Sequence, residues 1–264
     1  MSNPFKPSVG MTMSADIAVP QHDRVVQFYS QILTTGQQPL WQQDLMNNFG
    51  MPVIGIGAQS PEYAELPLQW MPHIQVANID QSVAQAIALG GSELMQGKDE
   101  AGHRQWAVLL DPNGAAFGLV AVVADEMPPQ LEDKNADELA HMGCIAWLDL
   151  TVDDAKMTRD FYTAVIGWKS EDVTMQHEGG SYSDYNMLSG DGQPVAGICH
   201  ARGVNGKVPA VWMLYLPVDD LSASLTHVKA AGGQIVNQSE SKDGKITQAL
   251  IQDPIGVNVV LAQG

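Results

Sequence analysis

The sequence predicts an α+β protein built as two tandem halves, with two β-α-β-β-β units in each half. A repeated turn is the first observation behind this prediction, because the motif Asp-Pro-x-Gly at residues 111–114 recurs at residues 253–256. Proline fixes φ at the first central position and glycine accepts a positive φ, so an antiparallel strand should leave each copy. The second observation is that strand-like alternation and helical periodicity follow one another in the same order in both halves.

The first unit begins at residues 11–19, where apolar and more polar side chains alternate as they do in a strand with one buried face. A helical period of apolar residues follows, and Asp23 and Gly36 are expected to be its N-cap and C-cap. Residues 37–58 then carry three short strand-like pieces separated by asparagine and glycine, which complete the unit.

The second unit repeats this order, with a strand at residues 71–76 and a helix from Asp80 to Leu89 that two glycines close. Its remaining strands are expected near residues 92–96, 105–110 and 115–123. An acidic, proline-containing stretch comes next and reads as a linker. The domain prediction is therefore a first domain over residues 1–125, a linker over 126–140 and a second domain over 141–264.

Landmarks of the first half return in the second half with two different offsets. Phe28-Tyr29 recurs 133 positions later, whereas Gly90-Gly91 and the Asp-Pro-x-Gly turn recur 142 positions later. The nine extra residues predict an insertion between Phe161 and Gly232, in the glycine-rich region of residues 178–206.

Composition limits the partners of the chain. Thirteen basic residues against thirty acidic residues give a net charge of −17, and the acidity is spread over the whole length. This argues against nucleic acid or an anionic membrane as a partner and mostly indicates solubility. The expected partner is a small-molecule ligand. The halves are expected to form a monomer with an internal pseudo-twofold axis, or a homodimer.

The two cysteines, Cys144 and Cys199, are too few for a disulfide framework and form no CxxC pair. A reducing compartment is therefore expected. The sequence has no signal-peptide pattern and no apolar run near the roughly 20 residues that span a bilayer. We expect a cytoplasmic protein.

Several motifs together resemble the vicinal oxygen chelate superfamily, which includes glyoxalase I, bleomycin-resistance proteins and extradiol dioxygenases, and in particular its tandem-domain glyoxalase-like branch. The matching segments are Trp147-Leu148-Asp149-Leu150, Phe161-Tyr162, Gly167-Trp168, Trp70-Met71-Pro72-His73-Ile74-Gln75-Val76, Leu89-Gly90-Gly91 and Asp111-Pro112-Asn113-Gly114-Ala115-Ala116-Phe117. The resemblance covers roughly residues 11–124 and 141–263. It implies that two units pair into a curved eight-stranded cup, with helices outside and the ligand on the concave face.

The resemblance also implies where metal-dependent relatives place His, Glu or Gln ligands. Those positions hold Ser14, Met71, Gly118, Trp147, Met213 and Val260. None of these is a good ligand for a divalent metal. A further ligand position falls near Ile56 in the first half and near Cys199 or His200 in the second. No cofactor is therefore expected, and a divalent metal is disfavoured.

One pair of residues could carry chemistry. Asp16 and His73 are expected to face the same cup from adjacent strands, and a carboxylate that holds an imidazole in one tautomer suits a general base near neutral pH. The alternative is a hydrogen-bonded pair that merely satisfies two half-buried polar groups. Asp149 takes the place of Asp16 in the second half, but Tyr215 stands where the histidine would be.

The predicted ligand-binding residues are those expected on the concave faces: Ser14, Met71, Trp147, Asp149, Met213, Tyr215 and Asn258. Trp147 either offers an apolar platform to a ring or acyl chain or fills the space of an absent metal. Trp70 and Trp212 should lie in the core by the alternation of their strands. His103 and Lys245 occupy equivalent loop positions. They are either exposed loop charges or groups at the mouth of the cup that bind an anionic substrate.

Two functions follow as hypotheses. The first is a metal-independent protein that binds a small, partly aromatic or apolar molecule in a concave cup. The alternative is an enzyme, either a glyoxalase-type lyase or isomerase or a related proton-transfer catalyst, that uses His73 and Asp16. Adjacent strand residues point to opposite faces, so Cys199 and His200 are not expected to form a nucleophilic pair.

Overall fold

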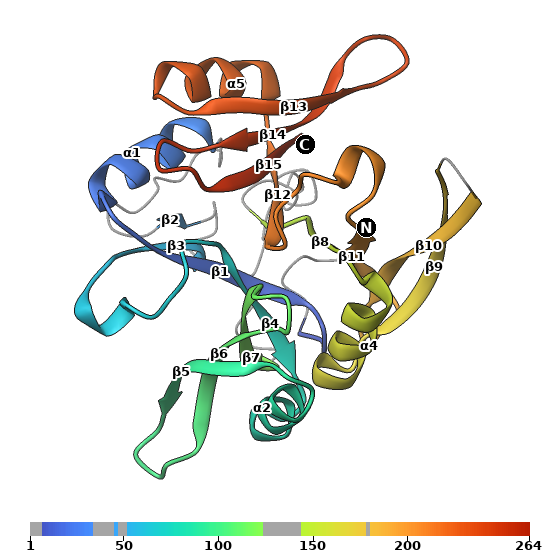
Figure 1. The fold of residues 1–264 in the computed structure, drawn as a ribbon. Coiled ribbons are helices and arrows are strands. Elements are labelled where there is room, and N and C mark those ends of the chain that lie inside the picture. Colours follow the sequence, from blue (N-terminus) through green and yellow to red (C-terminus); the bar gives the residue numbers. More distant parts are fainter. Residues whose placement is uncertain (1–6, 34–44, 47–51, 124–143, 178–179) are drawn as a thin grey trace, which may run out of the picture.

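The computed structural model of the protein describes residues 7–33, 45–46, 52–123, 144–177 and 180–264 (Figure 1). The elements of the first half are β1 (Thr12–Val19), α1 (His22–Ile32), β2 (Leu45–Met46), β3 (Pro52–Ala58), the 3-10 turn η1 (Pro61–Tyr63), β4 (Met71–Val76), α2 (Ile79–Ala88), β5 (Ser92–Lys98), β6 (Arg104–Leu110) and β7 (Ala116–Ala121). They form a sheet in the order β2-β3-β1-β4-β7-β6-β5.

The second half repeats this arrangement with one complete eight-stranded sheet. Its elements are β8 (Trp147–Val152), α4 (Ala155–Ile166), β9 (Lys169–His177), β10 (Gly180–Leu188), β11 (Pro194–His200), η2 (Gly203–Asn205), β12 (Trp212–Val218), α5 (Leu221–Ala230), β13 (Gln234–Glu240), β14 (Ile246–Gln252) and β15 (Asn258–Gln263). The order is β13-β14-β15-β12-β8-β11-β10-β9. The predicted α+β class, with two tandem halves of paired β-α-β-β-β units, is confirmed.

Two units join in each sheet through their opening strands. β1 pairs antiparallel with β4, which places Ser14 opposite His73 and Asp16 opposite Met71. β8 pairs in the same way with β12, which places Asp149 opposite Met213. The opening strand of each unit also pairs in parallel with the last strand of that unit. This register brings residues from both units to the centre of each cup.

The helix boundaries correct two details of the sequence prediction. The N-cap of α1 is Gln21, a left-handed residue with φ 58°, so Asp23 lies in the first helical turn and is not the cap. The N-cap of α2 is Asn78, whose side chain accepts the backbone N–H of Gln81, and this helix therefore begins at Ile79. The predicted C-cap Gly36 and the predicted linker 126–140 lie outside the described residues.

The extra nine residues of the second half lie between α4 and β11. Gly55 pairs with Asp16 in the first half, and Gly197 pairs with Asp149 in the second. Gly197 therefore corresponds to Gly55 with the larger offset of 142, so the insertion lies before Gly197. Between these landmarks β9 and β10 pair as a long hairpin of two nine-residue strands. The position overlaps the predicted range of residues 178–206 and extends N-terminal to it.

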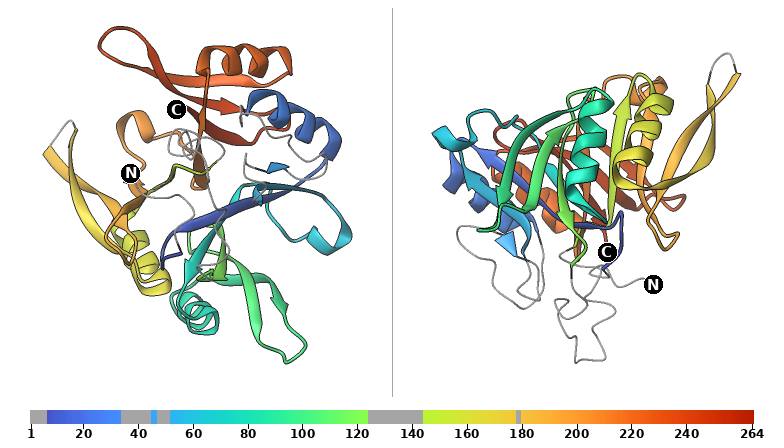
Figure 2. Two further views of the ribbon diagram at one scale, coloured as in Figure 1. Left: turned by 180° about the vertical axis from the view of Figure 1, so that it is seen from behind. Right: turned by 90° about the horizontal axis from the view of Figure 1, so that it is seen from below.

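Helices from the two halves pack against each other, α1 with α5 and α2 with α4, and Figure 2 shows α2 and α4 side by side. The phenol of Tyr29 donates to Asp253 at 3.2 Å, and that of Tyr162 donates to Asp111 at 3.3 Å. Each half therefore donates a hydrogen bond to the repeated turn of the other half. None of the helices in the described ranges is long and apolar enough to cross a membrane.

One large hydrophobic core runs through both halves, and it contains Trp70 and Trp212 as predicted. Trp70 contacts Tyr29 with the ring centroids 5.4 Å apart, and Trp212 contacts Tyr162 at 5.2 Å. Edge-to-face contacts of this kind stabilise buried aromatic clusters beyond the area they bury. The side chains that alternate with this core point away from the helices, and these are the side chains that line the cups.

Candidate ligand-binding cups

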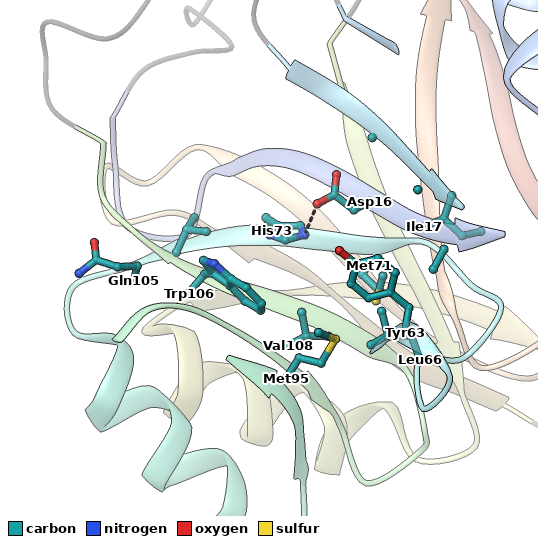
Figure 3. Close-up of a pocket in the computed structure, with 14 residues that line it drawn as sticks. Asp16, Ile17, Tyr63, Leu66, Met71, His73, Met95, Gln105, Trp106 and Val108 are labelled. Carbon is teal, nitrogen blue, oxygen red and sulfur yellow. Dashed lines mark ion pairs between the residues drawn. The ribbon is translucent and has the colours of Figure 1, made fainter. Parts of the chain in front are cut away.

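The first sheet encloses a cavity of about 470 Å³ (Figure 3), a volume within the range of small-molecule sites. Most of its wall is apolar, and a few polar groups converge on it. The lining residues are Asp16, Ile17, Ala18, Gly55, Gly57, Tyr63, Leu66, Met71, His73, Met95, Gln105, Trp106, Val108 and Val120.

The structure brings the predicted pair of Asp16 and His73 together in this cavity. The Nε2 atom of His73 lies 3.1 Å from the Oδ2 atom of Asp16, with the His73 side chain 12% exposed and the Asp16 side chain 50% exposed. The two atoms are within ion-pair distance, but their alignment is not that of a hydrogen bond. Nε2 is therefore buried without an aligned partner among the described residues. The imidazole therefore keeps hydrogen-bonding capacity that Asp16 does not satisfy in this arrangement.

Two glycines make the room that this pair occupies. A methyl group on Gly118 would lie 2.8 Å from Nδ1 of His73, and one on Gly55 would overlap the carboxylate of Asp16. Gly118 stands beside His73 in the parallel pairing of β4 and β7. Gly118 stands where metal-dependent relatives are expected to carry a ligand. Glycine is the only residue type that leaves this space for the imidazole.

Trp106 forms an aromatic wall of the first cavity, on strand β6 (Figure 3). Its indole lies against Gly97 of β5, where a methyl group would overlap the ring. Trp106 and Val108 share one face of β6, and Met95 lies on the neighbouring β5. None of these three residues was predicted as a site residue, although the alternation along β6 is a signal for Trp106 and Val108.

The second sheet encloses a smaller cavity of about 250 Å³. Its lining combines amide, hydroxyl and apolar side chains. The residues are Asp149, Thr151, Cys199, Asn205, Val208, Met213, Tyr215, Asn237, Gln238, Ser239, Gln248, Leu250 and Val260. Met213, Asp149 and Tyr215 were predicted from the sequence, and Met71 occupies the corresponding place in the first cavity.

Asp149 accepts two hydrogen bonds that hold its carboxylate in the second cup. The indole Nε1 of Trp147 donates to one oxygen at 2.8 Å, and the hydroxyl of Tyr215 donates to the other at 2.7 Å. Burial raises the pKa of Asp149 from its usual value, although both hydrogen bonds favour the charged form. Burial and the nearby charge of Asp149 raise the pKa of Tyr215 as well.

The side chains of Cys199 and His200 lie in different surroundings, as expected for adjacent residues of a strand. Cys199 lines the second cavity, and burial is the largest cause that raises the pKa of its thiol to about 12. A thiol with this pKa is a poor nucleophile near neutral pH. The ring Nδ1 of His200 lies 3.0 Å from Asp184, whose carboxylate also accepts the backbone N–H of His200.

Four other residues singled out from the sequence are not among the lining residues of either cavity. Ser14 is half-buried opposite His73 and is not among the lining residues, and Trp147 reaches the second cup only through its bond to Asp149. Asn258 lies at the start of β15 and accepts from Gln252 at 3.4 Å. The His103 side chain is 78% exposed, with its ring nitrogen 3.3 Å from Asp99.

The residues of the two cups do not fit the divalent metal that metal-dependent relatives use. A catalytic zinc site takes about three protein ligands of the nitrogen, sulfur or carboxylate type. In the described part of the chain, no three His, Cys, Asp or Glu side chains are grouped so that they could hold a metal ion. The expected ligand positions hold Ser14, Met71 and Gly118 in the first half and Trp147, Met213 and Val260 in the second.

Comparisons with known proteins agree with the architecture. Residues 144–261 match the family model described as Glyoxalase/Bleomycin resistance protein/Dioxygenase superfamily, and residues 13–120 match the model described as Glyoxalase-like domain. The Mycobacterium bovis protein CFP32, which is named as a glyoxylase, is 27% identical over 78% of this chain and 74% of its own length. The anthracycline biosynthesis protein DnrV of Streptomyces peucetius is 31% identical over 74% of this chain and 66% of its own.

Solved structures share the fold at low sequence identity. The 2,2',3-trihydroxybiphenyl 1,2-dioxygenase of Sphingomonas wittichii strain RW1 aligns with a TM-score of 0.60 and 14% identity, over 97% of this chain and 91% of that chain. A catechol 2,3-dioxygenase aligns with a TM-score of 0.59 and 14% identity, over 98% and 94%. At this level of identity the likeness concerns the arrangement of the strands and helices.

Proposed function

The chain belongs to the glyoxalase/bleomycin resistance protein/dioxygenase superfamily, and from this premise we propose that it binds a small, partly aromatic molecule in the first cup without a metal ion. The observation that carries the proposal is the composition of the first cavity, an apolar space of about 470 Å³ with one buried, unaligned imidazole nitrogen. Small-molecule sites commonly combine an apolar wall with a few placed polar groups.

The apolar wall favours a flat ring. Trp106 offers the face or edge of an indole, and Met71 and Met95 supply flexible thioethers that adapt to aromatic ligands. His73 and Asp16 lie together on one side of this wall (Figure 3). A ligand that carries a hydroxyl group on a ring would fill the apolar space and donate to the half-exposed carboxylate of Asp16, beside His73. The similarity to proteins named for anthracycline biosynthesis also supports an aromatic ligand.

Equilibrium binding tests this proposal. A panel of two-ring phenols, including 2-naphthol and 2,3-dihydroxynaphthalene, should contain members that bind with a Kd below about 1 mM, the range expected of modest apolar burial. Metal analysis of the purified protein is the second arm. The proposal fails if no member of the panel binds in this range, or if the protein carries stoichiometric zinc, nickel or iron.

A second candidate function is proton transfer, and the position of His73 favours it. In this reaction the imidazole of His73 accepts a proton from a carbon or oxygen atom of the ligand, and the imidazolium then returns that proton to a second atom. Asp16 stabilises the charged ring at 3.1 Å. The step needs no other reactant, which suits an isomerase or lyase.

Hydrogen exchange separates the two candidates. Proton transfer predicts that a ligand C–H exchanges with deuterated solvent in the presence of the wild-type protein, which NMR would detect. The variant His73→Gln should lose this exchange while it keeps the apolar wall. Binding without exchange would leave the chain as a binding protein, and exchange at the same rate in His73→Gln would remove His73 from the proton transfer.

A further inference from the structure

We infer that the second cup is a separate binding site for a neutral, hydroxyl-rich small molecule, such as a monosaccharide or a cyclic polyol. The inference does not depend on the ligand proposed for the first cup, because the two cavities share no lining residue. It begins from the chemistry of the side chains that converge on the second cavity.

Polar side chains that can both donate and accept gather around this cavity. Three carboxamides and two hydroxyl-bearing side chains come from η2, β8, β13 and β14, and a fourth carboxamide lies beside them on β13. These residues are Asn205, Thr151, Asn237, Gln238, Ser239 and Gln248. A carboxamide offers two N–H donors and one carbonyl acceptor, so it can bond to the donor and the acceptor of an alcohol. Such a set is suited to a ligand with several hydroxyl groups.

The corresponding residues of the first cup show that these polar side chains are not required by the fold. With the offset of 142, Tyr63 corresponds to Asn205, Met95 to Asn237, and Trp106 to Gln248. All six residues line the two cavities. Three positions on three separate elements are thus apolar or aromatic in one cup and carboxamides in the other, on the same backbone plan.

The residues next to these three positions also differ between the two halves. Gly97, which makes room for the indole of Trp106, corresponds to Ser239 in the second half. Ser239 accepts from the side-chain amide of Gln248 at 3.4 Å, a long bond that positions the amide without saturating it. The carbonyl of Asn237 accepts the backbone N–H of Gln238 at 2.8 Å, which leaves the NH₂ group of Asn237 to face a ligand.

The charge of the lining favours a neutral ligand. Asp149 is the one charged side chain among the lining residues, and they contain no lysine or arginine to attract an anion. Both oxygens of Asp149 already accept a hydrogen bond, and its burial disfavours the charged form. The carboxylate can still accept from one more hydroxyl group, as each oxygen has two lone pairs.

The remaining wall and the volume fit a small ring. Val208, Met213, Leu250 and Val260 supply apolar contact area, which the C–H groups of a sugar or polyol ring can cover. The cavity of about 250 Å³ has room for about eight water molecules at roughly 30 Å³ each. This is enough for a single six-membered ring with its hydroxyl groups, and it is too small for an oligosaccharide.

The test uses D-glucose, D-ribose and myo-inositol as probes against the full-length protein, with saturation-transfer NMR for detection and titration for the Kd. At least one probe should bind with a Kd below about 10 mM. The double variant Asn237→Met/Gln248→Trp installs the residues of the first cup and should raise that Kd at least about tenfold, because it removes two polar partners and fills the cavity. Met95→Asn/Trp106→Gln, the matched variant of the first cup, should leave the Kd unchanged.

Three results would overturn the inference: no binding of any probe, equal binding by Asn237→Met/Gln248→Trp, or loss of binding in the first-cup variant alone. Gln248→Ala, a truncation at the cavity wall, provides the same comparison if the double variant fails to fold. Titration with 2-naphthol in parallel reports on the first cup, so failure of one site is distinguished from failure of the other.

Discussion

The two cups differ in the side chains of their walls while their strands keep the same register. Tyr63, Met95 and Trp106 surround the first cavity, and three carboxamides take their places around the second. The helix-facing side chains of both halves pack in one continuous core, in which Phe28 and Phe161, Tyr29 and Tyr162, and Trp70 and Trp212 occupy matching positions. The core therefore constrains one face of each strand, and the concave face is free to take on a different ligand.

Neighbouring residues of the concave faces match each other in size, both where the two halves agree and where they differ. Asp16 and Gly55 correspond to Asp149 and Gly197, and in both halves a methyl group on the glycine would overlap the carboxylate. His73 lies beside Gly118, whereas its counterpart Tyr215 lies beside Val260. The imidazole needs the space that glycine leaves, and the phenol, which reaches Asp149, does not.

The largest expected effect comes from Gly118→Val, which places the residue of the second cup in the first. Its branched side chain would displace the His73 ring, because even a methyl group would lie 2.8 Å from Nδ1. We expect binding of an aromatic probe to weaken at least about tenfold and the free energy of unfolding to fall by about 1–3 kcal/mol. Calorimetric titration and urea unfolding measure the two effects.

The reverse change, Val260→Gly, provides the control for this comparison. It alters the second cup and leaves His73 untouched, so binding of the aromatic probe should stay at the wild-type level. If Gly118→Val binds the probe as the wild type does, the position of His73 has no part in the first site.

The next effect concerns the two tyrosines that tie the halves together. Tyr162 also accepts the indole N–H of Trp212 at 3.0 Å, whereas the indole N–H of Trp70 approaches Tyr29 without meeting the geometry of a hydrogen bond. Tyr162→Phe thus removes two buried hydrogen bonds and Tyr29→Phe removes one. We expect losses of about 2–3 kcal/mol and about 1–2 kcal/mol in the free energy of unfolding. Equal losses in urea unfolding would contradict this ordering.

The smallest effect is a dependence of stability on pH that comes from Asp149. Its pKa is raised in the folded state by burial, so its stabilising contribution is full below the unfolded pKa of about 3.9 and is lost as pH rises through the folded pKa. Asp149→Asn does not titrate. The free energy of unfolding of the wild type relative to this variant should therefore decrease as pH rises from about 4 and then level off.

A constant offset between the two proteins is expected, because the asparagine oxygen replaces only one of the two acceptors that Trp147 and Tyr215 use. The slope against pH is therefore the relevant measurement. A difference that does not change with pH, or that increases with pH, would show that burial does not raise the pKa of Asp149.

The sequence predicted the features that depend on local pattern and on repetition. The Asp-Pro-x-Gly turns, the paired Phe-Tyr helices and the strand alternation gave the two halves their order, and the same alternation placed Asp16 and His73 on one face. The N-cap of α1 was missed because Gln21 takes a left-handed conformation that its residue type does not favour.

Most of the cavity walls could not be predicted, since they depend on how strands and loops approach in space. Tyr63 and Leu66 enter the first cavity from η1 and the loop that follows it, where no periodicity indicates their direction. The role of Trp106 depends on Gly97 in the neighbouring strand, a contact that requires the register of β5 and β6. The exchange of apolar side chains for carboxamides becomes visible only when the two cavities are compared.

Calorimetric titration with 2-naphthol tests the central claim, that the first cup is the aromatic site and the second cup is not. We predict one bound molecule per chain with a Kd below about 1 mM for the wild type. Trp106→Gln should raise this Kd at least about tenfold, because it removes the aromatic wall of the first cavity. Gln248→Ala, at the equivalent position of the second cup, should leave the Kd within about twofold. An unchanged Kd in Trp106→Gln, or a Kd raised by Gln248→Ala, would contradict the claim.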